Sequence, residues 1–194
     1  MIAGHFGLAA AVKSRAPRAP LWALMLATVW LDVLFVPLVV AHVETFAPLP
    51  GTRGGYGEAL IHADYTHSLL GALIIAAAFG LVTAIPWGKG VGATLGAVVF
   101  SHWLLDLPMH HQDMPLLPGN AGDLPLLGFG LWSLPAASAI LELALVVGGS
   151  LLYWRAARRV ADEARPARTR LANVTAGAML LTGVLTLALN VAGQ

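Results

Sequence analysis

Five long apolar stretches constrain this chain more than any other feature of its sequence. A helix needs about 20 mostly apolar residues to cross a bilayer, and a bilayer core offers no hydrogen-bond partners to irregular backbone. We therefore predict an all-α fold, a polytopic membrane helical bundle of about five transmembrane helices. It forms a single integral membrane domain over residues 1–194. The predicted spans are residues 21–43, 67–86, 90–108, 130–154 and 171–193.

The composition supports this class and excludes others. Hydrophobic residues make up 58% of the chain and charged residues only 11%, which is more apolar than a soluble domain. The formal net charge of +1 argues against nucleic acid as a partner, because phosphate binding needs a concentrated basic surface. The chain has no cysteine, so any metal would be held by His, Asp or Glu.

The basic residues indicate which ends of the predicted spans face the cytoplasm. They gather before the first span, between the second and third spans, and between the fourth and fifth, and the positive-inside rule makes these three points cytoplasmic. We interpret residues 155–170 as a solvated loop in contact with anionic headgroups. The connections 44–66 and 109–129 carry acidic residues and only Arg53 as a basic one, so they belong on the opposite side. The cytoplasmic basic residues are Lys13, Arg15, Arg18, Lys89, Arg155, Arg158, Arg159, Arg165, Arg168 and Arg170.

Residues 1–20 are too short for a span but apolar enough for a partly inserted helix. We expect this helix to end near Lys13, with Pro17 and Pro20 closing it. His5 lies about 12 Å before Lys13 if the segment is helical, so its imidazole would rise toward Asp32. A cleaved signal peptide is the alternative interpretation of this end of the chain.

Four ionisable residues at similar depth in the predicted spans indicate a metal site. An ionisable group inside a span costs at least about 2.5 kcal/mol on insertion scales, so each one needs a partner. His102 and Asp106 are four residues apart, which puts them on one helical face about 6 Å apart along the axis. Asp32 and His67 come from two other helices, and no Lys or Arg lies in these three spans. A divalent cation would satisfy all four, whereas any one of them alone could instead hydrogen-bond a neighbouring helix.

Other polar residues near these spans leave alternatives open. His110 and His111 follow Pro108. Three interpretations stay open: a second metal site, the edge of a substrate-binding site, or a solvent-exposed loop. Glu142 lies in the middle of the fourth span, either as a further carboxylate of the site or as a protonated contact between helices. His42 and His62 are expected at the membrane interface rather than among the ligands.

Small and aromatic residues have structural interpretations. Gly92 and Gly96 place two small residues on one face of a helix, which allows a neighbouring helix to pack closely. Four tryptophans near predicted span ends are expected to be interfacial anchors, namely Trp87, Trp103, Trp132 and Trp154.

Several short motifs resemble, in this order, those of the bacterial inner-membrane proteins classed as membrane-bound metal-dependent hydrolases. They are Gly4 with His5, then Asp32, then "THSLL" at residues 66–70 and "SHWLLD" at residues 101–106. The resemblance covers roughly residues 1–118, which would be the metal-site core, with residues 130–194 as C-terminal helices. It implies a multi-pass protein of the bacterial inner (cytoplasmic) membrane, and the charge pattern places the site on the non-cytoplasmic side.

The same ordered set of residues is similar to the ligand order of zinc-dependent phospholipase C. That similarity implies a divalent metal, with zinc expected, as one or more ions. The chain has no match to the His-x-x-x-Glu pair that completes the phospholipase site, so the number of metals stays open. The implied ligands are Asp32, His67, His102 and Asp106, with His5 and His110 or His111 completing neighbouring sites.

These resemblances imply a hydrolase that cleaves a phosphoester of a phospholipid or lipid-linked substrate at the outer face of the membrane. Asp32 or Asp106 would bridge metals, and the carboxylate not used as a ligand would act as base. Asp64, beside His67, would orient an imidazole or touch substrate. The alternatives are a divalent-metal transporter or metal-binding protein, and a non-enzymatic membrane scaffold or regulator.

Overall fold

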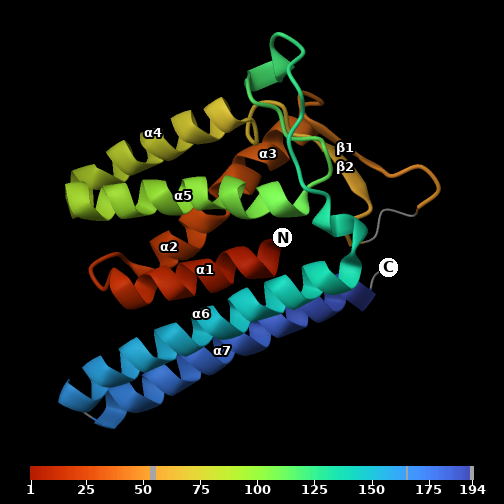
Figure 1. Ribbon diagram of the computed structural model, residues 1–194. Coiled ribbons are helices and arrows are strands. Elements are labelled where there is room, and N and C mark those ends of the chain that lie inside the picture. The colour runs from red at the N-terminus through yellow and green to blue at the C-terminus, as the bar shows by residue number, and fades with distance from the viewer. Residues whose placement is uncertain (53–55, 165, 193–194) are drawn as a thin grey trace.

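The computed structural model describes residues 1–52, 56–164 and 166–192 and is mostly helical (Figure 1). Short irregular segments join the helices, except at one end of the bundle, where a small ribbon and a long loop lie. The elements are α1 (Ile2–Arg15), α2 (Leu21–Thr28), α3 (Trp30–Val40), β1 (Thr45–Pro48), β2 (Ala59–His62), α4 (Leu69–Trp87), α5 (Lys89–Met109), η1 (Pro118–Asn120), η2 (Leu131–Ser133), α6 (Pro135–Ala164) and α7 (Pro166–Ala192).

The helices form three layers, with α1 in the middle. The pair α4 and α5 lies on one side of α1 and α2, and the pair α6 and α7 lies on the other (Figure 1). Helix α1 approaches α6 closely because both present glycine. A Cβ on Gly7 would lie 2.4 Å from the backbone oxygen of Leu145, and one on Gly149 would overlap the backbone of Gly7. The middle layer therefore has no room to shift relative to α6.

Four described helices, α4, α5, α6 and α7, are long and apolar enough to cross a membrane. They expose large apolar side chains, such as Ile85 (84% exposed), Leu81 (73%) and Leu181 (69%), as expected of helices that contact lipid. These helices correspond to the second to fifth predicted spans. The count of five holds if α2 and α3 are taken as one bent span.

The first predicted span is not one continuous helix. It breaks at Val29, and α2 and α3 are bent by 49° relative to each other. A second interruption of hydrogen bonding follows at Pro37 inside α3, because proline has no backbone N–H to donate. The break leaves backbone groups near Thr28 free for partners outside the helix.

The prediction of a solvated loop at residues 155–170 is wrong. Helix α6 continues to Ala164 and α7 begins at Pro166, so most of the arginines of this region lie on helices. The segment is rich in alanine and arginine, which have high helix propensity, and proline is favoured at the first position of a helix. Arg53 and Arg165, used to assign the topology, lie outside the described residues.

The predicted connections 44–66 and 109–129 contain regular structure and specific hydrogen bonds rather than being plain loops. Strands β1 and β2 pair antiparallel, with Thr45 opposite His62, an element that the sequence analysis did not predict. In the second connection, the carbonyls of Pro115 and Leu116 accept hydrogen bonds from the Leu69 and Leu70 amides. The first N–H groups of a helix have no partner within it, so this connection caps α4.

The predicted packing face on α5 is confirmed. Gly92 and Gly96 lie against Gly80 of α4, and a Cβ on Gly92 would come within 2.4 Å of the Gly80 carbonyl oxygen. Backbones this close gain dispersion contacts that larger side chains would prevent.

Replacing Gly92 with alanine should therefore destabilise the protein by about 1–3 kcal/mol, because the added methyl group meets backbone that cannot move aside. The thermal unfolding midpoint in detergent measures this loss. Gly90→Ala is the matched control, since no atom from elsewhere in the described part of the chain lies within 4 Å of a Cβ there. Equal midpoints for the two variants would contradict the packing argument.

Candidate metal centre

The imidazole of His102, on α5, is the centre of a buried polar cluster. Its ring is only 1% exposed. Its Nδ1 donates to the carbonyl oxygen of Thr28 at 2.8 Å, a backbone acceptor located at the break between α2 and α3. In the neutral imidazole this bond keeps the proton on Nδ1 and leaves the lone pair on Nε2, the nitrogen that would bind a metal.

Three ligand atoms from three different elements surround one point in this cluster. His67 Nε2 lies 3.2 Å from His102 Nε2, and Asp32 Oδ1 lies 3.4 Å from His102 Nε2 and 3.5 Å from His67 Nε2. Zinc bonds of about 2.0–2.1 Å in tetrahedral geometry place ligand atoms about 3.3 Å apart. The spacing of these atoms fits three corners of a tetrahedral site.

The orientation of His67 comes from a carboxylate that the sequence analysis did not assign to the site. Glu44 is buried and accepts hydrogen bonds from the backbone amides of Tyr65 and Thr66. The Thr66 hydroxyl lies 2.9 Å from Glu44 Oε2 and 2.9 Å from His67 Nδ1. A hydroxyl has one proton, and the carboxylate can only accept it, so the network assigns the proton of His67 to Nδ1 and its lone pair to Nε2.

The "THS" motif is explained by this arrangement. Thr66 connects the carboxylate to the ring, His67 supplies the ligand atom, and Ser68 caps α4 by accepting the Gly71 amide. Thr66, rather than Asp64, contacts the His67 ring, and the contact of Asp64 with substrate stays a prediction. The backbone carbonyl of Asp64 accepts a hydrogen bond from the Gly119 amide, which links Asp64 to the second connection.

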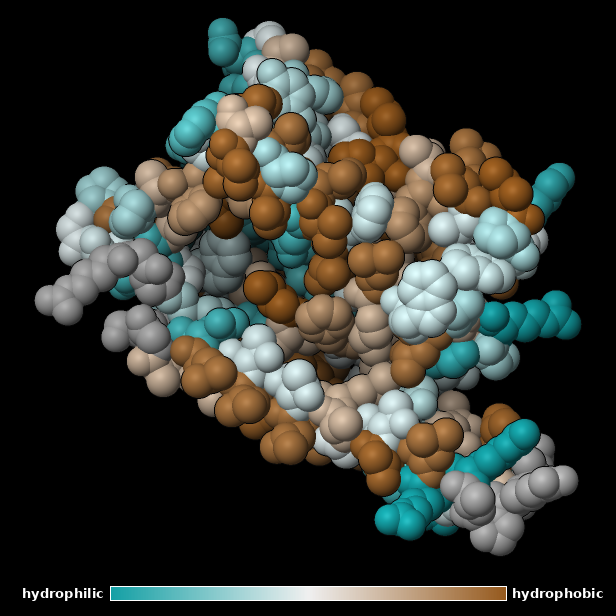
Figure 2. Space-filling view, turned by 180° about the vertical axis from the view of Figure 1, so that it is seen from behind, coloured by the Kyte–Doolittle hydropathy of each residue, from teal (hydrophilic) through white to brown (hydrophobic). Residues whose placement is uncertain are grey.

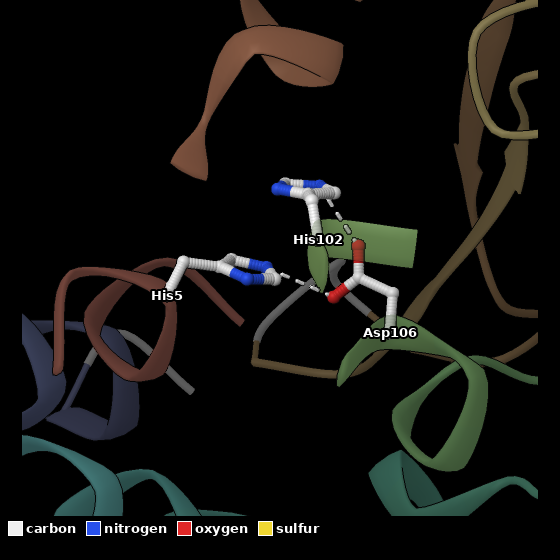
Figure 3. A group of neighbouring side chains, drawn as sticks. All are labelled: His5, His102 and Asp106. Atoms are coloured by element: carbon white, nitrogen blue, oxygen red, sulfur yellow. Dashed lines mark hydrogen bonds and ion pairs between the residues drawn. The ribbon is translucent and has the colours of Figure 1, made fainter. Parts of the chain in front are cut away.

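Asp106 joins His102 to His5 from the neighbouring helix α1 (Figure 3). Its Oδ2 lies 3.0 Å from His102 Nε2, and its Oδ1 lies 3.1 Å from His5 Nε2. The His5 and His102 rings are stacked with centroids 3.9 Å apart. The prediction that α1 carries His5 into the site is confirmed, but the contact of His5 is with Asp106 rather than with the predicted Asp32.

The cluster therefore contains two groups that could hold a metal ion. They share His102 and consist of Asp32, His67 and His102, and of His5, His102 and Asp106. His102 has a single free nitrogen, because Thr28 engages the other. This nitrogen can bind one metal ion at a time. The two groups therefore offer alternative or adjacent positions for an ion, and His102 cannot be a ligand in both at once.

The charges of the cluster favour a divalent cation. Asp32 and Asp106 bring two carboxylates to the site. Within the described residues no Lys or Arg side chain pairs with either of them, and the Met1 α-amino group lies 3.9 Å from Asp106 Oδ1. Buried charges require partners. A divalent ion would balance both acids while the imidazoles stay neutral.

His110 and His111 have different positions, which the sequence analysis could not separate. His110 is buried, and its Nδ1 donates to Asp113 at 2.9 Å while its Nε2 faces Asp106 Oδ2 at 3.8 Å. Helix α5 ends at Met109. Because the helix extends this far, His110 lies on the same face as Asp106, four residues before it. His111 points elsewhere, and its Nε2 donates to the Gly57 carbonyl.

Glu142 is a contact between elements and belongs to neither metal group. It is fully buried and accepts hydrogen bonds from the Tyr56 hydroxyl at 2.6 Å and from the Gly4 amide at 3.2 Å. Burial and the neighbouring carboxylate raise the pKa of Tyr56. Glu142 thus anchors the start of α1, next to His5.

Two of the predicted interfacial anchors are in fact buried beside the cluster. Trp103 is 4% exposed and donates its indole N–H to the His67 carbonyl. Trp132 packs against the His110 ring, with centroids 4.4 Å apart. His42 and His62 are exposed, as expected of residues that are not ligands.

Sequence reasoning missed Glu44 and Asp113 as supporting carboxylates. Asp113 follows His110 by three residues, a spacing that could have suggested the pair. Glu44 lies far from His67 in the sequence, and only the return of the chain through β1 and β2 brings them together. No protein-family model, curated protein or solved structure matches the chain.

Glu44→Gln should weaken metal binding about 10- to 100-fold, the usual cost of losing a supporting hydrogen bond. The amide can donate to the Thr66 hydroxyl, which would then donate to His67 Nδ1 and leave the ring proton on Nε2. Cobalt or zinc titration of the purified protein measures the affinity. Asp123→Asn, at an exposed acid of the second connection, is the control. Unchanged affinity in Glu44→Gln would mean that Glu44 only holds its loop.

Proposed function

We propose that this chain is a membrane-embedded, metal-dependent hydrolase that cleaves a phosphoester of a phospholipid or lipid-linked substrate at the non-cytoplasmic face. We expect zinc as the metal and the bacterial inner membrane as the location, in line with the motif resemblance at residues 1–118. The membrane placement is supported by the apolar helices α4 to α7.

The observation that carries this proposal is a group of three ligand atoms with one side open. Catalytic zinc sites have three protein ligands and a fourth position for water or substrate, whereas structural sites have four protein ligands. The His67 and His102 side chains are 5% and 1% exposed, but the Asp32 side chain is 38% exposed. The site is therefore reached from the side of Asp32.

The residues around the open position have distinct roles in this proposal. A bound zinc ion would lower the pKa of its water to about 7 and polarise a phosphoryl oxygen. Asp32, His67 and His102 would hold the ion. Asp106, kept in place by His5 at 3.1 Å, is positioned to accept a proton beside His102.

The surroundings of Asp32 support a lipid substrate. Helix α3 exposes Val33, Val36 and Val40, which are 40%, 60% and 75% exposed. These apolar side chains lie on the same helix as the partly exposed Asp32. Figure 2 shows hydrophilic side chains deep in a hollow whose rim is largely hydrophobic. A substrate with an acyl chain could approach such a site from within the bilayer.

A transport function is less well supported. A cation that passes through the protein needs further ligands between the cluster and the opposite end of the bundle. Helices α2 and α4 contain no ionisable residue, and α5 has none between Lys89 and His102. The buried side chains of Leu95, Val98 and Val99 occupy that part of α5 instead.

Metal content is the first test. Asp32→Asn, His67→Ala and His102→Ala should each lose most of the zinc that the purified wild-type protein retains, because each removes one of three ligands. His62→Ala, an exposed histidine in the neighbouring ribbon, should retain it. Elemental analysis after dialysis gives the stoichiometry. Equal and negligible metal in all five proteins would refute the metal centre.

Lipid turnover is the second test. Protein in mixed phospholipid vesicles should release phosphate-containing products, and chelation or Asp106→Asn should reduce the rate at least about 100-fold, as expected for loss of a metal or a base. Product analysis by mass spectrometry identifies the bond that is cleaved. If Asp106→Asn keeps its zinc and its rate, Asp106 is not the base. Zinc flux without lipid turnover would instead support transport.

A further inference from the structure

We propose that the end of the bundle opposite the metal centre contains a binding site for the phosphate headgroup of an anionic phospholipid. The proposal uses the membrane placement given above but does not depend on hydrolase activity. It concerns the basic residues that sequence analysis treated only as topology signals.

Two turns form a pocket at this end of the bundle. Arg15, at the end of α1, and Arg18, in the turn before α2, line one side, and Trp87 and Lys89, which flank the turn between α4 and α5, line the other. The pocket between them has a volume of about 440 Å³. Figure 1 places both turns at the end of the molecule away from β1 and β2.

The pocket is strongly positive. Arg15, Arg18 and Lys89 contribute three cationic side chains, and none of the described residues that line the pocket is acidic. The backbone adds to this charge, because α5 is 21 residues long and begins here without a side-chain cap. The free N–H groups and the dipole at a helix N-terminus attract phosphate.

The turns that form the pocket are held in place. Lys13 Nζ donates to the carbonyls of Pro17 and Ala19, at 2.8 and 2.7 Å, which fixes the turn that carries Arg15 and Arg18. On the other side, Gly88 has a φ of 83°, a conformation that glycine adopts without strain. The cationic side chains therefore project from two defined turns rather than from loose loops.

A lipid headgroup fits this site better than free phosphate. Directly before the pocket, α4 exposes Leu81 and Ile85, at 73% and 84%, so an acyl chain would have an apolar surface next to the headgroup. Trp87 contacts Trp22 edge to face, with centroids 5.5 Å apart. Paired tryptophans at this level are typical of the membrane interface. Basic pockets of this kind at the cytoplasmic side bind anionic headgroups.

The test compares two triple variants that remove the same charge. Arg15→Gln, Arg18→Gln and Lys89→Gln together alter the pocket. Arg159→Gln, Arg168→Gln and Arg170→Gln together alter basic residues that do not line it. Each purified protein is titrated in neutral detergent with phosphatidylglycerol and with phosphatidylcholine, and bound lipid is counted by native mass spectrometry.

The wild-type and control proteins should bind phosphatidylglycerol in preference to phosphatidylcholine, and the pocket variant should bind it at least about ten-fold more weakly. An equal loss in the control variant would overturn the site in favour of general surface charge. Displacement of the lipid by millimolar inorganic phosphate would identify free phosphate as the ligand. Absence of any lipid preference in the wild type would also refute the proposal.

Folding and metal content keep this test separate from the hydrolase proposal. Circular dichroism and the thermal midpoint show whether each variant is folded, and the single variant Arg18→Gln, at an exposed residue, replaces the triple variant if that one is not. Zinc content should be the same in all variants, because the pocket lies at the other end of the bundle. A wild type that binds lipid but lacks zinc would support the headgroup site and refute only the metal centre.

Discussion

The hydrogen bond from His102 to the carbonyl of Thr28 connects the helical layers to the chemistry of the site. Thr28 also donates its hydroxyl to the His5 carbonyl, so one residue joins α1, α2 and α5. The carbonyl is available because the helix breaks at Val29. With Nδ1 engaged in this bond, Nε2 is directed at Asp32, His67 and Asp106.

Three further carboxylates, two in the connections and one on α6, hold the rest of the site. Glu44, Asp113 and Glu142 are all buried, and each accepts a hydrogen bond from a histidine of the cluster or from a residue next to one. A buried carboxylate is costly unless its hydrogen bonds are satisfied. The ribbon and the loop at this end of the molecule supply those bonds, so these irregular segments are part of the site rather than simple connections between helices.

The parts of the fold that depend on local sequence could be predicted. Apolar stretches of membrane length predicted α4 to α7, and the spacing of four placed His102 and Asp106 on one face of α5. The break at Val29 could not be predicted, because no proline or glycine marks it. Trp103 resembled an interfacial anchor by its place near the end of a span, but its indole is buried against the His67 carbonyl. Its hydrogen-bond partner comes from another segment of the chain.

By itself, the sequence determined that this chain is helical and apolar, that its basic residues gather at the ends of helices, and that buried histidines and acids must find partners. These properties follow from composition and spacing, which act over one or two turns of helix. Only the tertiary structure decided that His5 contacts Asp106, that His110 faces the cluster while His111 does not, and that Glu44 governs His67. These contacts join residues far apart in the sequence, and their geometry depends on close packing between helices that no local pattern encodes.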